Sequence, residues 1–167
     1  MRTAEISSEE RRPQGQEEAV WFLGGLLTIK ASGENTQGQV CVIEHVCPRG
    51  VAAPLHLHRR EAEWFFVVDG HVTFTVGDEV ISAGAGAFAY GPPQVPHTFV
   101  VDGDEGARFL LVAQPAGLEG FIRELSVPAT SLTLPPASVA MPSPPEMMAV
   151  ATKYGIEILG PPPGLDG

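Results

Sequence analysis

The stretch APLHLHRREAEWFFVVDG, residues 53–70, places two histidines and a glutamate where an apolar strand is expected. His56 and His58 stand two residues apart, and Glu63 opens the apolar run 64–68. In a strand, residues two apart lie on one face with Cα atoms about 6.6 Å apart. Both imidazoles can therefore turn toward one ion, with bonds of about 2.0–2.1 Å. The spacing predicts two metal ligands on one strand.

Glu63 is expected to share a strand face with Phe65 and Val67, because side chains alternate along a strand. A carboxylate without a partner in apolar surroundings costs several kcal/mol or stays protonated, and a bound cation removes that cost. Glu63 is therefore the third candidate ligand. Glu61 has the same parity but sits in a polar loop among arginines, so we expect its side chain to face water.

A fourth candidate, His97, lies downstream in the stretch GAGAFAYGPPQVPHTFV, residues 84–100. Three prolines stiffen the approach to His97, which enters a strand and shares its face with Phe99. Three neutral imidazoles and one carboxylate suit a divalent, borderline-to-hard ion with open positions for substrate. The lack of a nearby thiolate argues against a structural zinc site.

Short apolar or alternating runs separated by Gly, Pro, Asn or Asp clusters predict an all-β fold, an antiparallel barrel or sandwich. Asp69-Gly70 reads as a two-residue hairpin turn and Gly77-Asp78 as a second, while 102–106 reads as a looser acidic hairpin. The predicted strands cover residues 26–31, 39–46, 63–69, 71–76, 79–82, 87–91, 97–101 and 107–113.

Two short helices are expected after the last strand. The first is indicated by an apolar stripe at i, i+3, i+4 and i+7, formed by Leu118, Phe121, Ile122 and Leu125. A Pro-rich crossing over 128–142 follows. The second begins at the capping box of residues 143–146 and ends near Gly155, with an apolar face of Met147, Val150, Ala151 and Tyr154. Both helices should pack on the barrel.

Length and composition favour one domain. A chain of 167 residues with 44% hydrophobic content can bury roughly 70% of its unfolded surface in one core. We expect a flexible arm over 1–18, a barrel over 19–114, and helices with a Pro-rich tail over 115–167. The net charge of −10 repels phosphate groups, so neither nucleic acid nor an anionic membrane is an expected partner.

The N-terminal residues have no apolar segment typical of a signal peptide, so a cytoplasmic location is expected. Cys41 and Cys47 stand six apart in a predicted strand, about 20 Å apart at ~3.3 Å per residue, so they cannot bridge each other. We expect buried, reduced thiols. An edge strand near residues 20–31 and the Pro-rich tail favour a homodimer.

Two motifs in this sequence resemble those of the cupin family. The first motif, G(X)5HXH(X)3-4E(X)6G, is matched at every fixed position, and the second, G(X)5PXG(X)2H(X)3N, is matched with two departures, Gln94 for its Gly and Val101 for its final Asn. These departures put in question the turn before His97 and leave the ligands intact. The matching residues are Gly50, His56, His58, Glu63 and Gly70 in the first motif, and Gly86, Pro92 and His97 in the second.

The resemblance implies a jelly-roll type antiparallel β-barrel that holds a divalent transition metal (Ni, Mn, Fe, Co or Cu) through His56, His58, Glu63 and His97. The layout also resembles the small quercetin 2,3-dioxygenase-like cupins. By that resemblance the protein is a metal-dependent dioxygenase that cleaves a flavonol or similar aromatic enol with dioxygen. Glu63 would be both ligand and catalytic base, which requires a pKa near the working pH.

Other readings of the same site remain open. A metal-cupin cyclase, isomerase or decarboxylase of secondary metabolism would keep the ligands without using dioxygen, and a cupin that only binds a small molecule would not turn it over. An apolar surround without Arg or Lys favours an aromatic or polyketide-like substrate over a sugar phosphate or oxalate. Phe65, Val67 and Phe99 are the candidate substrate-pocket residues. His45 and His71 lie outside both motifs and are expected to be ordinary strand residues, His71 facing solvent.

Overall fold

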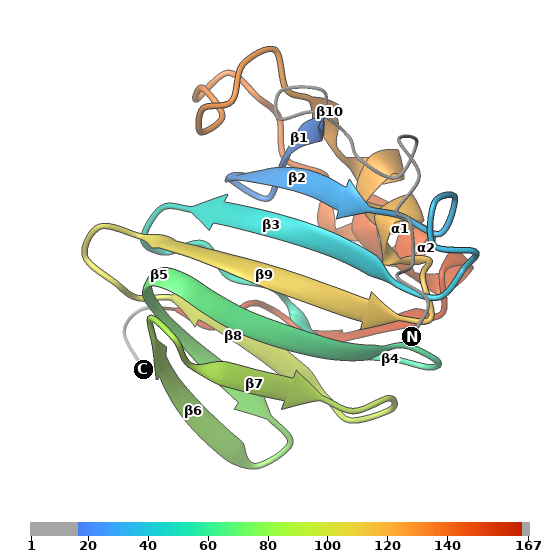
Figure 1. Ribbon diagram of the computed structural model, residues 1–167, viewed down its shortest axis with the longest axis horizontal. Helices are drawn as coiled ribbons and strands as arrows, with labels where there is room; N and C mark the ends of the chain where they lie inside the picture. The colour runs from blue at the N-terminus through green and yellow to red at the C-terminus, as the bar shows by residue number, and fades with distance from the viewer. Residues whose placement is uncertain (1–16, 165–167) are drawn as a thin grey trace, which may run out of the picture.

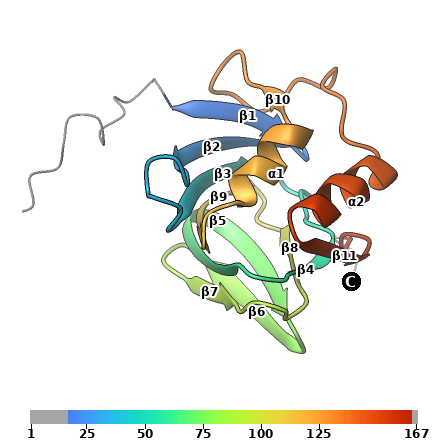
Figure 2. The ribbon, with the colours of Figure 1, turned by 90° about the vertical axis from the view of Figure 1, so that its right-hand side faces the viewer.

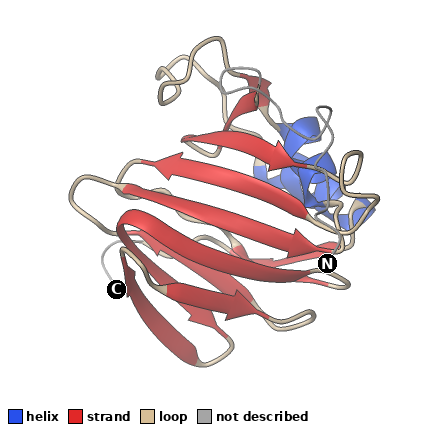
Figure 3. Ribbon diagram, in the orientation of Figure 1, coloured by secondary structure: helices blue, strands red, loops and turns tan. Residues whose placement is uncertain are grey.

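The computed structural model describes residues 17–164, and it is dominated by strands with two short helices near its C-terminal end (Figure 3). Residues 1–16 of the predicted arm lie outside the described range. Within that range neither helix has the length and hydropathy to span a bilayer. In chain order the elements are β1 (Glu18–Phe22), β2 (Gly25–Ala31), β3 (Cys41–Cys47), β4 (Leu55–His58), β5 (Ala62–Val76), β6 (Glu79–Gly84), β7 (Phe88–Gly91), β8 (His97–Val101), β9 (Ala107–Gln114), α1 (Leu118–Leu125), β10 (Val127–Pro128), α2 (Pro144–Lys153) and β11 (Ile156–Gly160).

The strands form two antiparallel layers that share β5. The order is β10–β1–β2–β3–β9–β5–β7 in one layer and β6–β5–β8–β4–β11 in the other (Figure 1). Each layer turns its alternating apolar side chains inward, and one continuous core collects residues from both. The predicted all-β class with an antiparallel barrel and C-terminal helices is confirmed.

Asp69-Gly70 does not form the predicted hairpin. β5 passes through both residues as one strand, and its pairing with β9 continues on both sides of them. A register shift between Val67 and Asp69 marks a bulge. Gly70 has a φ of +79°, and a Cβ at that position would overlap the carbonyl oxygen of Gly106. Gly70 therefore lets the backbone of β5 come close to the loop before β9, at the point where β5 passes from one layer to the other.

The other two predicted turns have different outcomes. Gly77-Asp78 does join two paired strands, since Val76 of β5 lies opposite Glu79 of β6. The acidic loop 102–106 links β8 to β9, but those strands pair with other partners and not with each other. This loop therefore crosses from one layer to the other and closes no hairpin.

Both predicted helices are present and lie together on one side of the molecule (Figure 2). The apolar stripe of α1 is buried along its length. α2 begins at Ser143, whose side chain and that of Glu146 form the reciprocal capping box. Gly155, with a φ of +70°, follows its last turn. β11 then pairs with β4, so the C-terminal residues hold the edge of the second layer.

The two cysteines are buried on the inner face of β3 and unbridged, as predicted. Burial raises the pKa of each thiol to about 12. Both residues therefore act as small apolar core groups.

Gly70→Ala tests the close approach of β5 to the loop before β9. The substitution forces a Cβ into the Gly106 carbonyl oxygen, so we expect the free energy of unfolding to fall by about 3 kcal/mol or more. Gly86→Ala is the matched control, because Gly86 has a similar φ of +86° but open space at its Cβ position. Its cost should be about 1 kcal/mol. Urea denaturation measures both, and equal losses would contradict the passage of β5 described above.

Candidate metal centre

Four side chains predicted as ligands come together in one cluster. His56 and His58 lie on β4, Glu63 near the start of β5, and His97 at the start of β8. Each offers one ligand atom, and these four atoms all lie within 4.8 Å of one another. Direct pairing of His56 with His97 across β4 and β8 brings the two motifs together. All but His56 are almost fully buried.

The turn before His97 accommodates a residue other than the glycine of the second motif. Gln94, in place of a glycine, adopts a φ of +65°, in the left-handed region that glycine favours. Its backbone N–H donates to the carbonyl oxygen of His58 at 2.7 Å. The His97 ring then packs 3.6 Å from where a Cβ of Gly91 would stand. The turn thus ties the two ligand-bearing segments directly to each other.

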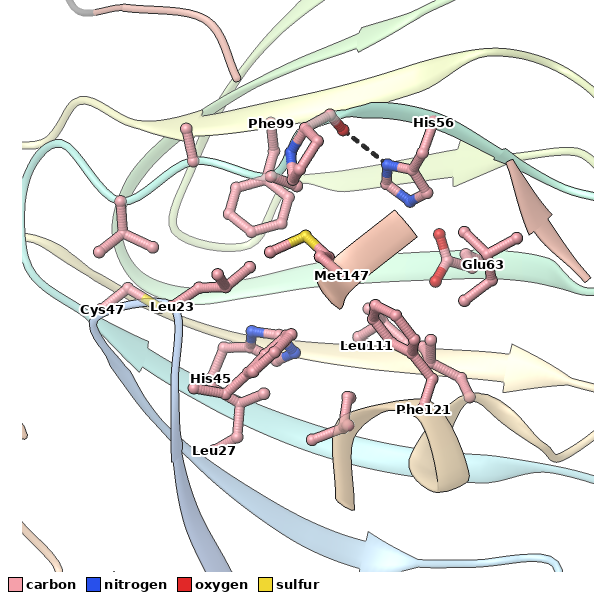
Figure 4. Close-up of a pocket in the computed structure, with 18 of the residues that line it drawn as sticks. Leu23, Leu27, His45, Cys47, His56, Glu63, Phe99, Leu111, Phe121 and Met147 are labelled. Carbon is pink, nitrogen blue, oxygen red and sulfur yellow. Dashed lines mark hydrogen bonds between the residues drawn. The ribbon is translucent and has the colours of Figure 1, made fainter. Parts of the chain in front are cut away.

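Backbone carbonyls fix the orientation of two of the imidazoles. His56 Nδ1 lies 2.7 Å from the carbonyl oxygen of Pro54, and His97 Nδ1 lies 2.9 Å from that of Val95 (Figure 4 draws the first). Because a carbonyl oxygen only accepts, each Nδ1 must carry a proton and donate it. The Nε2 atoms are then the ones available for a metal, an arrangement typical of metal-ligating histidines.

Glu63 and His58 provide the test of whether a cation fits this cluster. Glu63 Oε2 lies 2.6 Å from His97 Nε2, and its Oε1 lies 3.3 Å from His58 Nε2. Both ring nitrogens of His58 are buried, and neither has a hydrogen-bond partner among the described residues. Buried polar atoms are normally satisfied. A cation shared by the four side chains would satisfy the Nε2 atom of His58, which faces Glu63, so the residues present fit a metal.

Glu61 is not the solvent-facing loop residue that its neighbours suggested. It is 3% exposed, and its Oε2 lies 3.6 Å from His58 Nδ1. Gly117, just before α1, lies close to the same carboxylate, since a Cβ there would be 3.6 Å from Glu61 Oε1. The side chain of the neighbouring Arg60, in contrast, is largely exposed. Tertiary packing of the turn before α1 therefore buries the carboxylate behind His58.

The charges of the cluster follow from its mutual contacts. Burial by itself would raise the pKa of Glu63, but His58, His97 and His56 together lower the pKa to about 2. Burial opposes the charging of His58, yet Glu63 and Glu61 outweigh it and raise the pKa of His58. Burial, and then repulsion from His97, lowers the pKa of His56 to about 4. Glu63 is therefore a ready anionic ligand.

An apolar cavity opens in front of the cluster inside the barrel, with a volume of about 90 Å³. In Figure 4, His56 and Glu63 lie at one side of it and the Met147 side chain reaches in from α2. None of the described residues that line it is Arg or Lys. Its wall includes Phe22, Leu27, Phe65, Phe99, Leu111 and Phe121.

Of the candidate pocket residues, Phe65 and Phe99 line the cavity, whereas Val67 is fully buried in the wall and is not among the lining residues. Sequence reasoning missed three further contributors: His45 on β3, and the two helix residues Phe121 and Met147. The alternation of β3 was a usable signal for His45, since it puts that residue on the inner face. For the two helix residues no such signal exists, because a sequence pattern shows the apolar face of a helix but not which part of the barrel that face covers. His71 is partly exposed, with its ring held by Asp102 and Ser82.

Comparison with known proteins agrees with this geometry. Residues 42–113 match the family model for the cupin domain. Quercetin 2,3-dioxygenase of Bacillus subtilis (strain 168) is 28% identical over 103 residues, which is 62% of this chain but only 30% of that protein. The chain thus spans less than a third of this relative.

Solved cupins share the fold. An RmlC-like cupin from Shewanella frigidimarina superposes with a TM-score of 0.55 at 18% identity, covering 64% of this chain and 92% of its own. A mutant of Bacillus subtilis oxalate decarboxylase superposes with a TM-score of 0.53 at 26% identity, covering 60% and 28% respectively. From the strand order, the four converging donor groups and the matched region, residues 42–113 correspond to a cupin domain, and the chain resembles the small quercetinase-like cupins.

Proposed function

We propose that this cupin is a metal-dependent enzyme with a quercetinase-like dioxygenase activity on a flavonol or a similar aromatic enol. The observation that carries the proposal is the junction of two unlike surfaces: four convergent nitrogen and oxygen donors open into a cavity whose wall is otherwise almost entirely apolar. Such a site suits a mainly apolar molecule with one acidic oxygen that can reach the cluster.

His56, His58, Glu63 and His97 would hold the cation, which the donor set restricts to a divalent transition metal such as Ni, Mn, Fe, Co or Cu. A bound ion of this kind would supply Lewis-acid activation of an oxygen ligand and a fixed point for orienting the substrate. The hydrogen bonds from His56 and His97 to backbone carbonyls keep their Nε2 atoms in position for this purpose.

Glu63 would also handle the proton of the substrate hydroxyl. Its carboxylate stays ionised because of the surrounding imidazoles, which lower its pKa to about 2. As a carboxylate it can accept a hydrogen bond from the incoming hydroxyl and take up its proton at the reacting oxygen.

The wall of the cavity selects against charged substrates. With no Arg or Lys among the described lining residues, a dianion such as oxalate or a sugar phosphate would be desolvated without a counter-charge. The structural likeness to oxalate decarboxylase therefore does not extend to an oxalate-like substrate. Stacking on Phe65 and Phe99 instead favours a flat ring system.

A flavonol would need more room than the cavity offers. The cavity volume of about 90 Å³ is below the ~150 Å³ of an apolar cavity that takes up benzene, so a three-ring flavonol would extend beyond it. Phe121 of α1 and Met147 of α2 line the cavity. Outward movement of these helices, or of the Met147 side chain, would admit the substrate.

Metal binding by the cluster is tested with chelator-treated protein titrated with Ni, Mn, Fe, Co or Cu. We expect one ion per chain by elemental analysis and a rise in Tm, because the ion binds the folded state. Glu63→Gln should weaken binding by more than about 100-fold, beyond the usual loss for a residue that only orients a ligand. His71→Gln is the control, because His71 lies outside the cluster, and unchanged affinity in Glu63→Gln would contradict the assignment.

Dioxygenase activity is tested by aerobic incubation of the metal-loaded protein with quercetin, following oxygen uptake, release of carbon monoxide and loss of the long-wavelength flavonol absorption. At saturating metal, Glu63→Gln should lower turnover by about 100-fold or more, the usual scale for a proton-transfer residue, while His71→Gln should match the wild type. A metal-loaded protein that leaves both oxygen and the flavonol band unchanged would refute the dioxygenase.

A further inference from the structure

Among the described residues, His45 is the one buried polar group of the cavity wall that the metal cluster does not use. It lies on β3, whose inward side chains are otherwise Cys41, Ile43 and Cys47. The residue is 7% exposed, and its Nε2 is buried without a hydrogen-bond partner among the described residues. An imidazole in an apolar row, lacking a partner on the protein, calls for an explanation.

Strand register places His45 well away from the cluster. It lies opposite Phe109 of β9, which lies opposite Val67 of β5. Val67 is four residues beyond Glu63, about 13 Å along the strand. His45 therefore does not share the cation site, and its ring reaches the same cavity from another part of the wall (Figure 4).

Packing, and not hydrogen bonding, holds the His45 ring in place. It stacks on Phe109 with ring centres 4.7 Å apart and planes 20° apart, and it meets Phe99 edge-on at 6.4 Å. Two aromatic neighbours thus fix the plane of the imidazole. The directions in which the ring nitrogens can form hydrogen bonds are therefore set before any ligand enters.

The ring is neutral at physiological pH. Burial, only partly offset by the Glu63 carboxylate, lowers the pKa of His45 to about 4. A neutral imidazole has one N–H donor and one lone pair, so it can accept from a hydroxyl or donate to a carbonyl oxygen. It offers no counter-charge to an anion.

We propose that His45 is a specificity-determining residue that hydrogen-bonds a hydroxyl or carbonyl oxygen at the end of the substrate remote from the metal cluster. This inference rests on the proposed function, which places the acidic oxygen of the substrate at the cluster, and it narrows the substrate class. The preferred molecule is flat and mainly apolar, and it carries a second oxygen group at its far end. A ring system with a single enol and no second polar group leaves His45 unsatisfied.

The test compares binding of two flavonols to metal-loaded protein without oxygen, so that no turnover is needed. Quercetin carries hydroxyls on its outer rings, whereas 3-hydroxyflavone keeps the ring system and only the 3-hydroxyl. In calorimetric titrations His45→Leu should weaken quercetin binding roughly tenfold, the usual scale for one lost hydrogen bond in a buried site. It should leave the affinity for 3-hydroxyflavone unchanged, and His45→Gln, which retains a donor and an acceptor, should recover part of the loss.

Two measurements separate this role from a structural or metal-binding one. Metal content of His45→Leu should equal that of the wild type, and its Tm should be at least as high, because the substitution removes a buried polar group that has no partner. A lower Tm would show a structural role for His45, and loss of the ion would make it part of the metal site; either result would overturn the proposal. Equal weakening of both flavonols, or of neither, would overturn the role of His45 alone. If the wild type binds neither flavonol, the proposed function fails and this inference fails with it.

Discussion

The placement of an ionised carboxylate inside an apolar barrel is the constraint on which the site depends. Glu63 is 2% exposed, and an isolated charge in such a position is strongly unfavourable. Three imidazoles from two other strands make it tolerable, and the resulting cluster joins β4, β5 and β8 at their ends. The same attraction that keeps Glu63 ionised gives the cation a ready-made negative partner, while the apolar wall in front keeps water scarce. Electrostatics in the barrel interior is stronger than in water, so this one arrangement serves both binding and reactivity.

Much of the site could be predicted from sequence because its geometry is local. The two-residue spacing of His56 and His58 puts them on one strand face, and the prolines before His97 set its entry to the next strand. Glu61 could not be placed in this way, because its burial depends on the turn before α1, more than 50 residues downstream. The shape of the cavity depends likewise on Phe121 and Met147, which line it. The apolar stripe of a helix shows that the helix packs against something, but not which part of the barrel it covers.

The fold was predictable as a class and less so in its connections. The alternating runs indicated the strands, and the apolar stripe and capping box indicated both helices. Asp69-Gly70 misled because the local preference for a turn was outweighed by pairing with β9 on both sides of it. His45 was underestimated for a related reason: its parity on β3 was visible, but its missing hydrogen-bond partner is a property of the assembled interior.

The pairing of β11 with β4 has a consequence for how the centre is assembled in time. His58 lies opposite Ile156 and His56 opposite Ile158, so the strand with two donors is flanked by β8 on one side and by β11, the last of the described strands, on the other. A ribosome makes residues 156–160 long after it has made β4, and until then one side of the donor strand has no backbone partner. A product shortened before residue 156 would never gain this pairing, and the strand that carries two of the candidate ligands would stay open on that side.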